Sequence, residues 1–423
     1  MSTSSTRSTS SKGSPPAKTR GSRGRPRIGL ALAGGGPLGA IYEIGALCAI
    51  SESIAGLDLS DCDSYIGVSA GGFIAAGLVN GMTPRQICAA FIENTAPAPD
   101  SFEPSMLLHP AWGEYLQRLG KLPGLLGEAI WQSVVEGRSL LGAFERLARA
   151  LPTGLLSGEA LEAQVRRQFS EVKGRSDDFR QLRHRLVLVA TDLDSGESVP
   201  FGMPGLDHVP ISRAVRASAA LPGLFPPVEI EGRHYVDGAL KRTIHASVLL
   251  DEGLDLLICL NPLVPYQSHA PDEPHEPGRF TPPIPHLVDG GLPIVLSQTL
   301  RSLIHSRLEL GMRGYSRSHP DTDIVLFEPD PRDPEMFLAN TFSYSQRRHL
   351  AEHAYQATRA LLIKRHVKLQ HQLERHGLSL RMDLLHDPSR RLIADLPVTG
   401  CRMHLALQRL DHSLRTLEAR YAG

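Results

Sequence analysis

The stretch of residues 63–79 constrains the fold of this chain more than any other. It begins as a short apolar strand, turns through Gly67–Gly71 (Gly-Val-Ser-Ala-Gly) and continues as a helix. This turn matches the G-x-S-x-G pattern, in which a serine sits on a tight strand-to-helix turn with its hydroxyl exposed. Gly67 and Gly71 flank the serine because they supply conformations and clearances that a Cβ would forbid. The pattern predicts Ser69 at the apex of a strand–turn–helix unit.

A second strand–loop–helix unit precedes this one. Residues 27–33 are apolar, few in number and ended by glycine, which is typical of a buried strand. The glycine loop Gly34–Gly39 (Gly-Gly-Gly-Pro-Leu-Gly) follows, and apolar residues then recur at near-helical spacing to about residue 54. Both units therefore place a glycine-rich turn between a strand and a helix.

Strands and helices continue to alternate along the chain. Thr83-Pro84 predicts a helix start, because a capping hydroxyl is followed by proline at the first helical position. Further strands are expected at residues 185–190, 198–201, 228–230, 234–236, 254–260 and 323–327, and helices at 83–94, 157–169, 211–220, 293–310 and 345–372. The alternation predicts an α/β fold, a three-layer α/β/α sandwich with a mostly parallel central sheet.

Composition divides the chain into three parts. Residues 1–26 are rich in Ser, Thr, Gly and Pro, hold several Lys or Arg and no acid, and predict a disordered basic tail, which is either simply solvated or weakly attracted to anionic lipid. Residues 27–330 are expected to form the α/β domain. Within it, residues 96–160 read as a helical insertion or a lid, and residues 331–423 as a C-terminal helical extension.

Charge, hydropathy and cysteine spacing exclude several classes of protein. The net charge is zero, and the body beyond the basic tail is mildly acidic, so we expect no nucleic-acid partner. No run of about 18 apolar residues predicts a transmembrane helix, and the tail lacks the apolar region of a secretory signal. Five scattered cysteines without C-x-x-C spacing predict neither a zinc site nor a disulfide framework. We therefore expect reduced thiols and a cytoplasmic location.

Two glycine loops at the ends of neighbouring strands have a joint chemical explanation. Ser69 would attack an acyl carbonyl, and backbone N–H groups of Gly34, Gly35 and Gly36 would stabilise the developing oxyanion. Among the acids, Asp237 is well placed to be the base, because it follows an apolar strand and is backed by Gly238. An unperturbed aspartate, with a pKa of about 3.9, is a weak base, and burial would raise that pKa to a useful range.

Three stretches, taken in order, resemble the three motifs of the patatin-like phospholipases. They are Gly34–Gly39, Gly67–Gly71 and Asp237-Gly238-Ala239. Residues 190–193, 217–222 with 225–227, and 235–238 also look like that family. The resemblance covers roughly residues 25–265 and extends at most to residue 330.

The resemblance implies a lipid acyl hydrolase of the phospholipase A or lysophospholipase kind. It implies Ser69 as the nucleophile, Asp237 as the base and the amides of Gly34, Gly35 and Gly36 as the oxyanion hole. No catalytic histidine, cofactor or metal is implied. The expected substrate is a lipid or phospholipid acyl ester, and the apolar content of residues 96–135 suggests peripheral membrane contact.

One departure from the family pattern lies beside the expected base. Thr243-Ile244-His245 stands where the family usually has an Asn-x-Pro stretch. The loop next to Asp237 is therefore expected to differ in shape. His245 either modifies Asp237 or has a purely structural role.

Three other interpretations compete with a Ser–Asp hydrolase. Gly34, Gly36 and Gly39 also satisfy the dinucleotide pattern G-x-G-x-x-G, but the next strand ends at Ser69 without the required acid. A Ser-His-Asp carboxylesterase would need a histidine near the serine, and the candidates are His208, His234, His245 and a histidine within residues 269–286. A non-catalytic, patatin-like binding module is the third interpretation.

Overall fold

A central eight-stranded sheet organises the computed structural model, which describes residues 25–102, 109–111, 115, 153–240, 244–267, 286–339 and 344–394. The strand order is β6-β7-β4-β3-β1-β8-β9, with β5 paired to β4. The strands are β1 (Ile28–Leu32), β3 (Ser64–Val68), β4 (Arg185–Asp192), β5 (Ser198–Phe201), β6 (Val228–Ile230), β7 (Arg233–Asp237), β8 (Leu256–Leu260) and β9 (Asp323–Phe327). The five strands β4, β3, β1, β8 and β9 pair in parallel, and β5, β6 and β7 add antiparallel pairs at one side.

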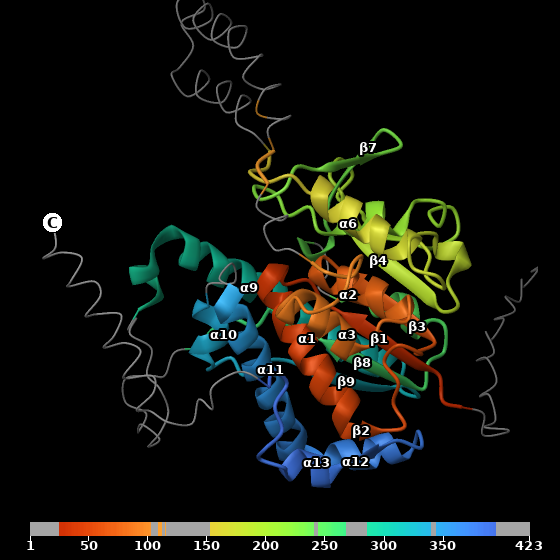
Figure 1. Ribbon diagram of the computed structural model, residues 1–423, viewed down its shortest axis with the longest axis vertical. Helices are drawn as coiled ribbons and strands as arrows, with labels where there is room; N and C mark the ends of the chain where they lie inside the picture. Colours follow the sequence, from red (N-terminus) through yellow and green to blue (C-terminus); the bar gives the residue numbers. More distant parts are fainter. Residues whose placement is uncertain are drawn as a thin grey trace, which may run out of the picture.

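Helices cover both faces of this sheet (Figure 1). Strand β1 explains why, because all five of its residues are buried: Leu30 and Leu32 join one apolar core, while Ala31 joins a second core on the opposite face. The first face carries α1 (Gly36–Ser53), α2 (Ala70–Val79) and α7 (Ile211–Ser218), and the second carries α8 (Ser247–Leu250) and part of α9 (Gly291–Ser318). The expected three-layer α/β/α sandwich is thus confirmed.

Most of the predicted elements are present with shifted ends. The helix expected from Thr83 begins with a capping box between Thr83 and Gln86 and forms α3 (Pro84–Cys88) and a π-helical turn (Ala89–Glu93). Helix α6 (Glu159–Ser170) lies at its predicted place, and α9 runs eight residues beyond the predicted end at residue 310. The remaining short elements are β2 (Ile54–Ala55), β10 (Ser379–Leu380) and the 3-10 turns Phe179–Gln181, Gly238–Leu240 and Leu287–Gly290.

The C-terminal helices pack against the sandwich. They are α10 (Pro334–Leu338), α11 (Tyr344–Lys364), α12 (His366–Glu374) and α13 (Met382–His386). The single helix expected over residues 345–372 is therefore two helices, which are separated at Arg365. Helix α11 lies along α1 (Figure 1), and Gly45 allows this approach, because a Cβ there would lie 2.5 Å from the carbonyl oxygen of Ala351.

Several predictions fall outside the described residues. They concern the basic tail, most of the insertion or lid at residues 96–160, Thr243, Cys401 and the chain beyond residue 394. Within the described ranges, no helix has the length and hydropathy needed to cross a bilayer. The domain boundaries at residues 27 and 330 remain a prediction.

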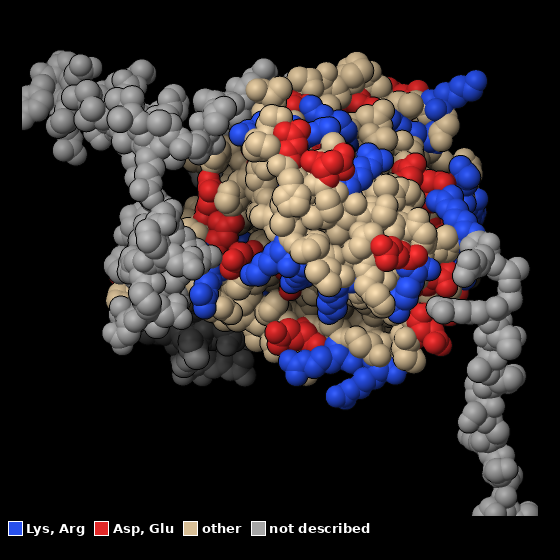
Figure 2. All heavy atoms as spheres, turned by 90° about the horizontal axis from the view of Figure 1, so that it is seen from below, with Lys and Arg blue, Asp and Glu red and all other residues tan. Residues whose placement is uncertain are grey.

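Acidic and basic side chains are interspersed over the face drawn in Figure 2, with uncharged areas between them. Charged side chains also pair within the described residues. Glu162, for example, accepts hydrogen bonds from Arg166, Arg213 and Arg216 at 2.8–3.0 Å. This face therefore carries no large patch of one charge.

Candidate active site

Ser69 occupies a strained turn between β3 and α2. Its φ is 52° and its ψ is −123°, a conformation that residues with a Cβ rarely adopt. The neighbouring glycines make this turn possible. A Cβ on Gly67 would lie 2.4 Å from the Cα of Gly72, and a Cβ on Gly71 would lie 2.5 Å from the carbonyl oxygen of Ala33. The G-x-S-x-G pattern thus reflects close packing of β1, β3 and α2.

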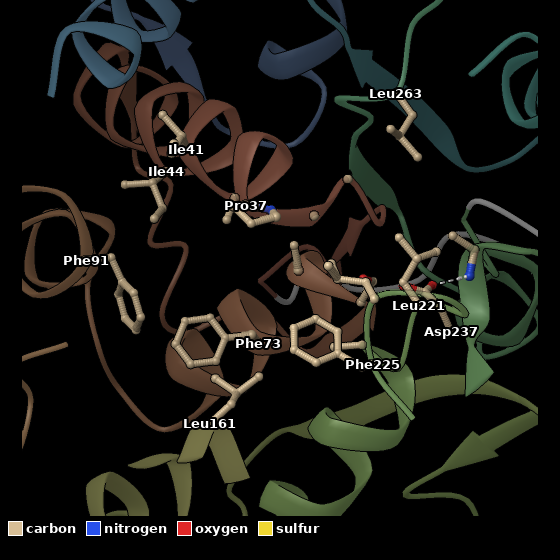
Figure 3. A pocket seen from close by; sticks show the side chains of 18 of the residues that line it. Pro37, Ile41, Ile44, Phe73, Phe91, Leu161, Leu221, Phe225, Asp237 and Leu263 are labelled. Carbon is tan, nitrogen blue, oxygen red and sulfur yellow. Dashed lines mark hydrogen bonds between the residues drawn. The ribbon is translucent and has the colours of Figure 1, made fainter. Parts of the chain in front are cut away.

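Strand pairing brings Asp237 to Ser69. Asp237 ends β7 and pairs with Ala190 on β4, while β4 pairs in parallel with β3, which leads into Ser69. The Ser69 hydroxyl lies close enough to the Asp237 carboxyl group to lower its pKa, and both residues line one cavity. The backbone N–H of Ala239 donates to Asp237 Oδ1 at 2.8 Å (Figure 3). The serine and the aspartate predicted from sequence therefore meet, although 168 positions separate them.

Gly238 makes the sharp turn after Asp237 possible. A Cβ at Gly238 would lie 2.2 Å from the carbonyl oxygen of Val189. Any larger residue would push the end of β7 away from β4. Glycine at position 238 is therefore needed for the close packing of β7 on β4, beside the carboxyl group that Asp237 supplies.

Burial changes the acidity of Asp237. The side chain is 3% exposed, and desolvation raises the pKa of its carboxyl group to about 6. The hydrogen bonds from Ser69 and from the Ala239 N–H act in the opposite direction, because they stabilise the ionised form. A carboxylate with this pKa is mostly ionised at neutral pH and still basic enough to accept a proton.

The glycine loop lies against the same serine. A Cβ on Gly34 would lie 3.0 Å from the Cβ of Ser69 and 3.1 Å from the Cβ of Ala239. Gly35 caps the N-terminus of α1, and Gly36 has a φ of +60° with open space around its Cα. Gly39 approaches Pro262, so a Cβ there would lie 3.0 Å from the proline ring. The first N–H groups of an α-helix lack partners within the helix, which suits this loop to binding an anion.

Ser218 is a site residue that sequence reasoning missed. It lies at the end of α7 and is fully buried. Its Oγ accepts a hydrogen bond from the backbone N–H of Ser69 at 2.8 Å and donates to the carbonyl oxygen of Val189 at 2.6 Å. Ser218 therefore ties the strained turn to β4. Its only sequence signal is its place in residues 217–222, which resemble the family without suggesting a role.

A cavity of about 320 Å³ opens over Ser69 and Asp237. Its walls come from α1, α2, α9 and the residues after α7, and most of the side chains are apolar, as Figure 3 shows for Ile41, Phe73 and Phe225. The charged residues that line it are Asp237, Arg301 and Arg347. The cavity can accept an apolar chain with one polar end at the serine.

Among the histidine candidates, His208, His234, His245 and His286 do not line this cavity. The candidates His269 and His275 lie outside the described residues. His208 contacts Glu231 at 2.6 Å on the surface, and His234 is exposed on β7. His245 is buried elsewhere, next to Ile244 in the second core. Within the described residues, no group of three or more His, Cys, Asp or Glu side chains has the geometry of a metal site.

Comparisons with known proteins agree with the resemblance seen in the motifs. The family model of the patatin-like phospholipases matches residues 30–250, just over half of the chain. A Mycobacterium tuberculosis protein described as an uncharacterized NTE family protein is 29% identical over 133 residues, which are 31% of this chain and 34% of that protein. A Mycobacterium bovis protein matches to the same extent. The chain thus matches about a third of the length of these curated relatives.

The chain is also similar to two proteins of known structure. The crystal structure of VipD from Legionella pneumophila is 15% identical with a TM-score of 0.35, and the match covers 80% of this chain and 67% of that chain. The type III effector protein ExoU is 15% identical with a TM-score of 0.32, and the match covers 81% of this chain and 53% of that chain.

Proposed function

Because the chain belongs to the patatin-like phospholipase family, we propose that it hydrolyses carboxylic esters of lipids with Ser69 as the nucleophile and Asp237 as its base. One observation carries the proposal. The buried carboxyl group of Asp237, with its raised pKa, lies beside the hydroxyl of Ser69 in the lining of an apolar cavity. A serine that only shaped a turn would need no acid partner at that place.

The first half of the reaction follows from this contact. Asp237 accepts the hydroxyl proton as Ser69 Oγ attacks the acyl carbonyl carbon, and the carbonyl oxygen becomes an oxyanion. Backbone N–H groups of Gly34, Gly35 and Gly36 stabilise that charge, and each such donor typically contributes about 3 kcal/mol. Asp237 then returns the proton to the leaving alcohol, and the acyl group remains on Ser69.

The second half repeats these steps with water. Asp237 removes a proton from the attacking water molecule, the glycine loop stabilises the second oxyanion, and Ser69 leaves with the proton as the fatty acid forms. The backbone N–H of Ser69 does not take part as a donor, because it is already bonded to Ser218. The donors are therefore expected to come from the glycine loop.

The lining of the cavity supports an acyl chain as the bound group. Phe73, Phe91 and Phe102 pack together on one wall, with ring centroids 4.4–6.2 Å apart. Burying an apolar chain against such a wall gives roughly 25 cal/mol per Å². Phospholipid or lysophospholipid esters are the proposed substrates. The cytoplasmic location remains a prediction.

The competing interpretations receive less support. A Ser-His-Asp esterase requires a histidine within reach of Ser69, and His208, His234 and His245 all lie outside the cavity lining. A dinucleotide site requires an acid where β3 ends, and Ser69 stands there instead. A non-catalytic binding module would not need the strained φ of Ser69.

A panel of acyl esters tests the proposal. The native protein should release fatty acid from at least one phospholipid or lysophospholipid, and Ser69→Ala should abolish that release. Ser297→Ala is the matched control, because Ser297 lines the same cavity and its hydroxyl accepts a hydrogen bond from Arg301. Equal turnover by the native protein and the Ser69→Ala variant would refute the proposal.

A further inference from the structure

Helix α9 exposes an unusual number of large apolar side chains. Ten such side chains are strongly exposed among the described residues, and seven of them lie between residues 288 and 310. Leu292 is 69% exposed, Leu296 is 58% exposed and Leu303 is 56% exposed. Single exposed leucines are ordinary, whereas a contiguous apolar patch marks an interaction site.

These side chains share one face of the helix. Val295 and Leu296 lie three and four residues after Leu292, and Leu303 lies seven residues after Leu296, so all four lie on one side of an α-helix. Residues 290–300 contain no charged side chain. A helix face that only met water would carry charged residues there. We call the set Val288, Leu292, Val295, Leu296, Leu300 and Leu303 the α9 apolar face.

The α9 apolar face continues into the cavity above Ser69. Leu300 belongs to both, since it is 37% exposed and also lines the cavity. Ile304, one turn further along, is buried in the cavity wall. Leu156 also lines the cavity and is half-buried, while its neighbour Leu155 is 57% exposed. The rim of the cavity is therefore apolar on the outside as well as the inside. Figure 1 shows α9 at the periphery of the body, beside α1 and α10.

The second half of α9 is basic. Beyond Arg301, which lines the cavity, the helix holds the exposed residues Arg307, Arg313 and Arg317 against a single acid, Glu309. An apolar stretch followed by arginines is typical of helices that lie in the interface of an anionic membrane. Each basic side chain near such a surface contributes roughly 1 kcal/mol of attraction.

We propose that the α9 apolar face docks on an anionic lipid surface and thereby places the mouth of the cavity at that surface. An anionic lipid surface is the occupant that fits all three features of this region. Its apolar chains can pack against the leucines, its negative charge attracts the arginines, and its acyl groups are of the kind that the adjoining cavity can accept. Hydrolysis of the docked lipid rests on the proposed function, whereas the docking itself does not depend on it.

Vesicle binding by the full chain tests the proposal. The variant Leu292→Ser/Leu296→Ser/Leu303→Ser changes three exposed side chains, none of which lines the cavity. The control Leu193→Ser/Val367→Ser removes two exposed apolar side chains elsewhere. Each protein is sedimented with vesicles of ether-linked phosphatidylcholine and phosphatidylglycerol, which no esterase can cleave. Turnover of a short nitrophenyl ester, monomeric in water, is measured in parallel.

The native and control proteins should sediment with the vesicles, while the triple variant should partition at least about tenfold less and keep its turnover of the soluble ester. Equal vesicle binding by the triple variant would overturn the proposal. So would absence of binding by the native protein, as expected if another segment of the chain covered the face.

A native dimer that the triple variant converts to a monomer, with unchanged vesicle binding, would assign the face to a second copy instead. Failure to hydrolyse any ester, with vesicle binding intact, would refute the proposed function and leave the docking surface in place.

Discussion

The backbone N–H of Ser69 donates to the side-chain Oγ of Ser218, with an N···Oγ distance of 2.8 Å. Ser218 in turn donates to Val189 on β4. The strained turn that presents the Ser69 hydroxyl is therefore held by a second serine from a distant part of the chain. This bond accounts for how the turn keeps a φ of 52° at a residue with a Cβ.

Ser218→Ala should lower both stability and turnover. The substitution leaves the Ser69 N–H and the Val189 carbonyl group buried without this partner, which costs about 1–3 kcal/mol. The turn would relax, and kcat should fall by more than about tenfold because the hydroxyl is misplaced. Ser212→Ala is the matched control. Ser212 lies on the same helix, is equally buried and bonds to Asp177, so its loss should cost stability without lowering kcat. Equal kcat losses in the two variants would contradict a positioning role for Ser218.

The pH profile of turnover should follow the ionisation of Asp237. Burial raises the pKa of this carboxyl group to about 6, and only the ionised form can accept the Ser69 proton. The value of kcat/KM on a soluble ester should therefore rise with pH through about 6 and then level off. A profile that rises only near pH 7 and is abolished by replacing one of His208, His234 and His245 would favour a histidine base instead.

Asp237→Asn should remove activity and raise stability at neutral pH. The folded state favours the protonated carboxyl group, so the native protein loses stability as pH rises from about 4 to about 6, when the group must ionise while buried. The shift corresponds to about 3 kcal/mol. Asparagine avoids this cost and can still accept from the Ala239 N–H. Denaturant unfolding at pH 5 and pH 8 measures the effect, and an Asp237→Asn variant that is less stable than the native protein at pH 8 would count against it.

Gly34→Ala should impair catalysis through the glycine loop. The added methyl group would lie 3.0 Å from Ser69 Cβ and 3.1 Å from Ala239 Cβ, so the loop must move away from the serine. If its N–H groups stabilise the oxyanion, kcat should fall by about 10²–10³. Gly81→Ala provides a fold control, because Gly81 has a positive φ, where alanine is strained, but has open space around it. Turnover close to the native value in Gly34→Ala would exclude this loop as the oxyanion hole.

The sequence predicted those features that depend on short-range geometry. Gly67, Gly71 and Gly238 each stand where a Cβ would overlap backbone atoms, so their pattern alone indicated the turns beside Ser69 and Asp237. The contact between Ser69 and Asp237 depends on the pairing of β7 with β4, which no short stretch encodes. The place of Asp237 after an apolar strand and the resemblance to a family suggested it only indirectly.

Other features have no local signal. Ser218 acts through tertiary contacts, and the local sequence does not distinguish it from Ser212 on the same helix. The close approach of α11 to α1 depends on Gly45 meeting Ala351, which are 306 positions apart. The sequence of α9 also could not predict that its apolar residues are exposed, because a helical pattern of apolar residues does not show whether a neighbouring element covers the apolar face.

Covalent labelling with a fluorophosphonate tests the central claim most directly. Such a reagent phosphonylates an activated serine, and peptide mass spectrometry locates the adduct. The account predicts one adduct, on Ser69, that is lost in Ser69→Ala and forms at least about a hundredfold more slowly in Asp237→Asn. Ser297→Ala should label like the native protein. An adduct on another residue, or labelling of Ser69 at the native rate in Asp237→Asn, would contradict the Ser69–Asp237 dyad.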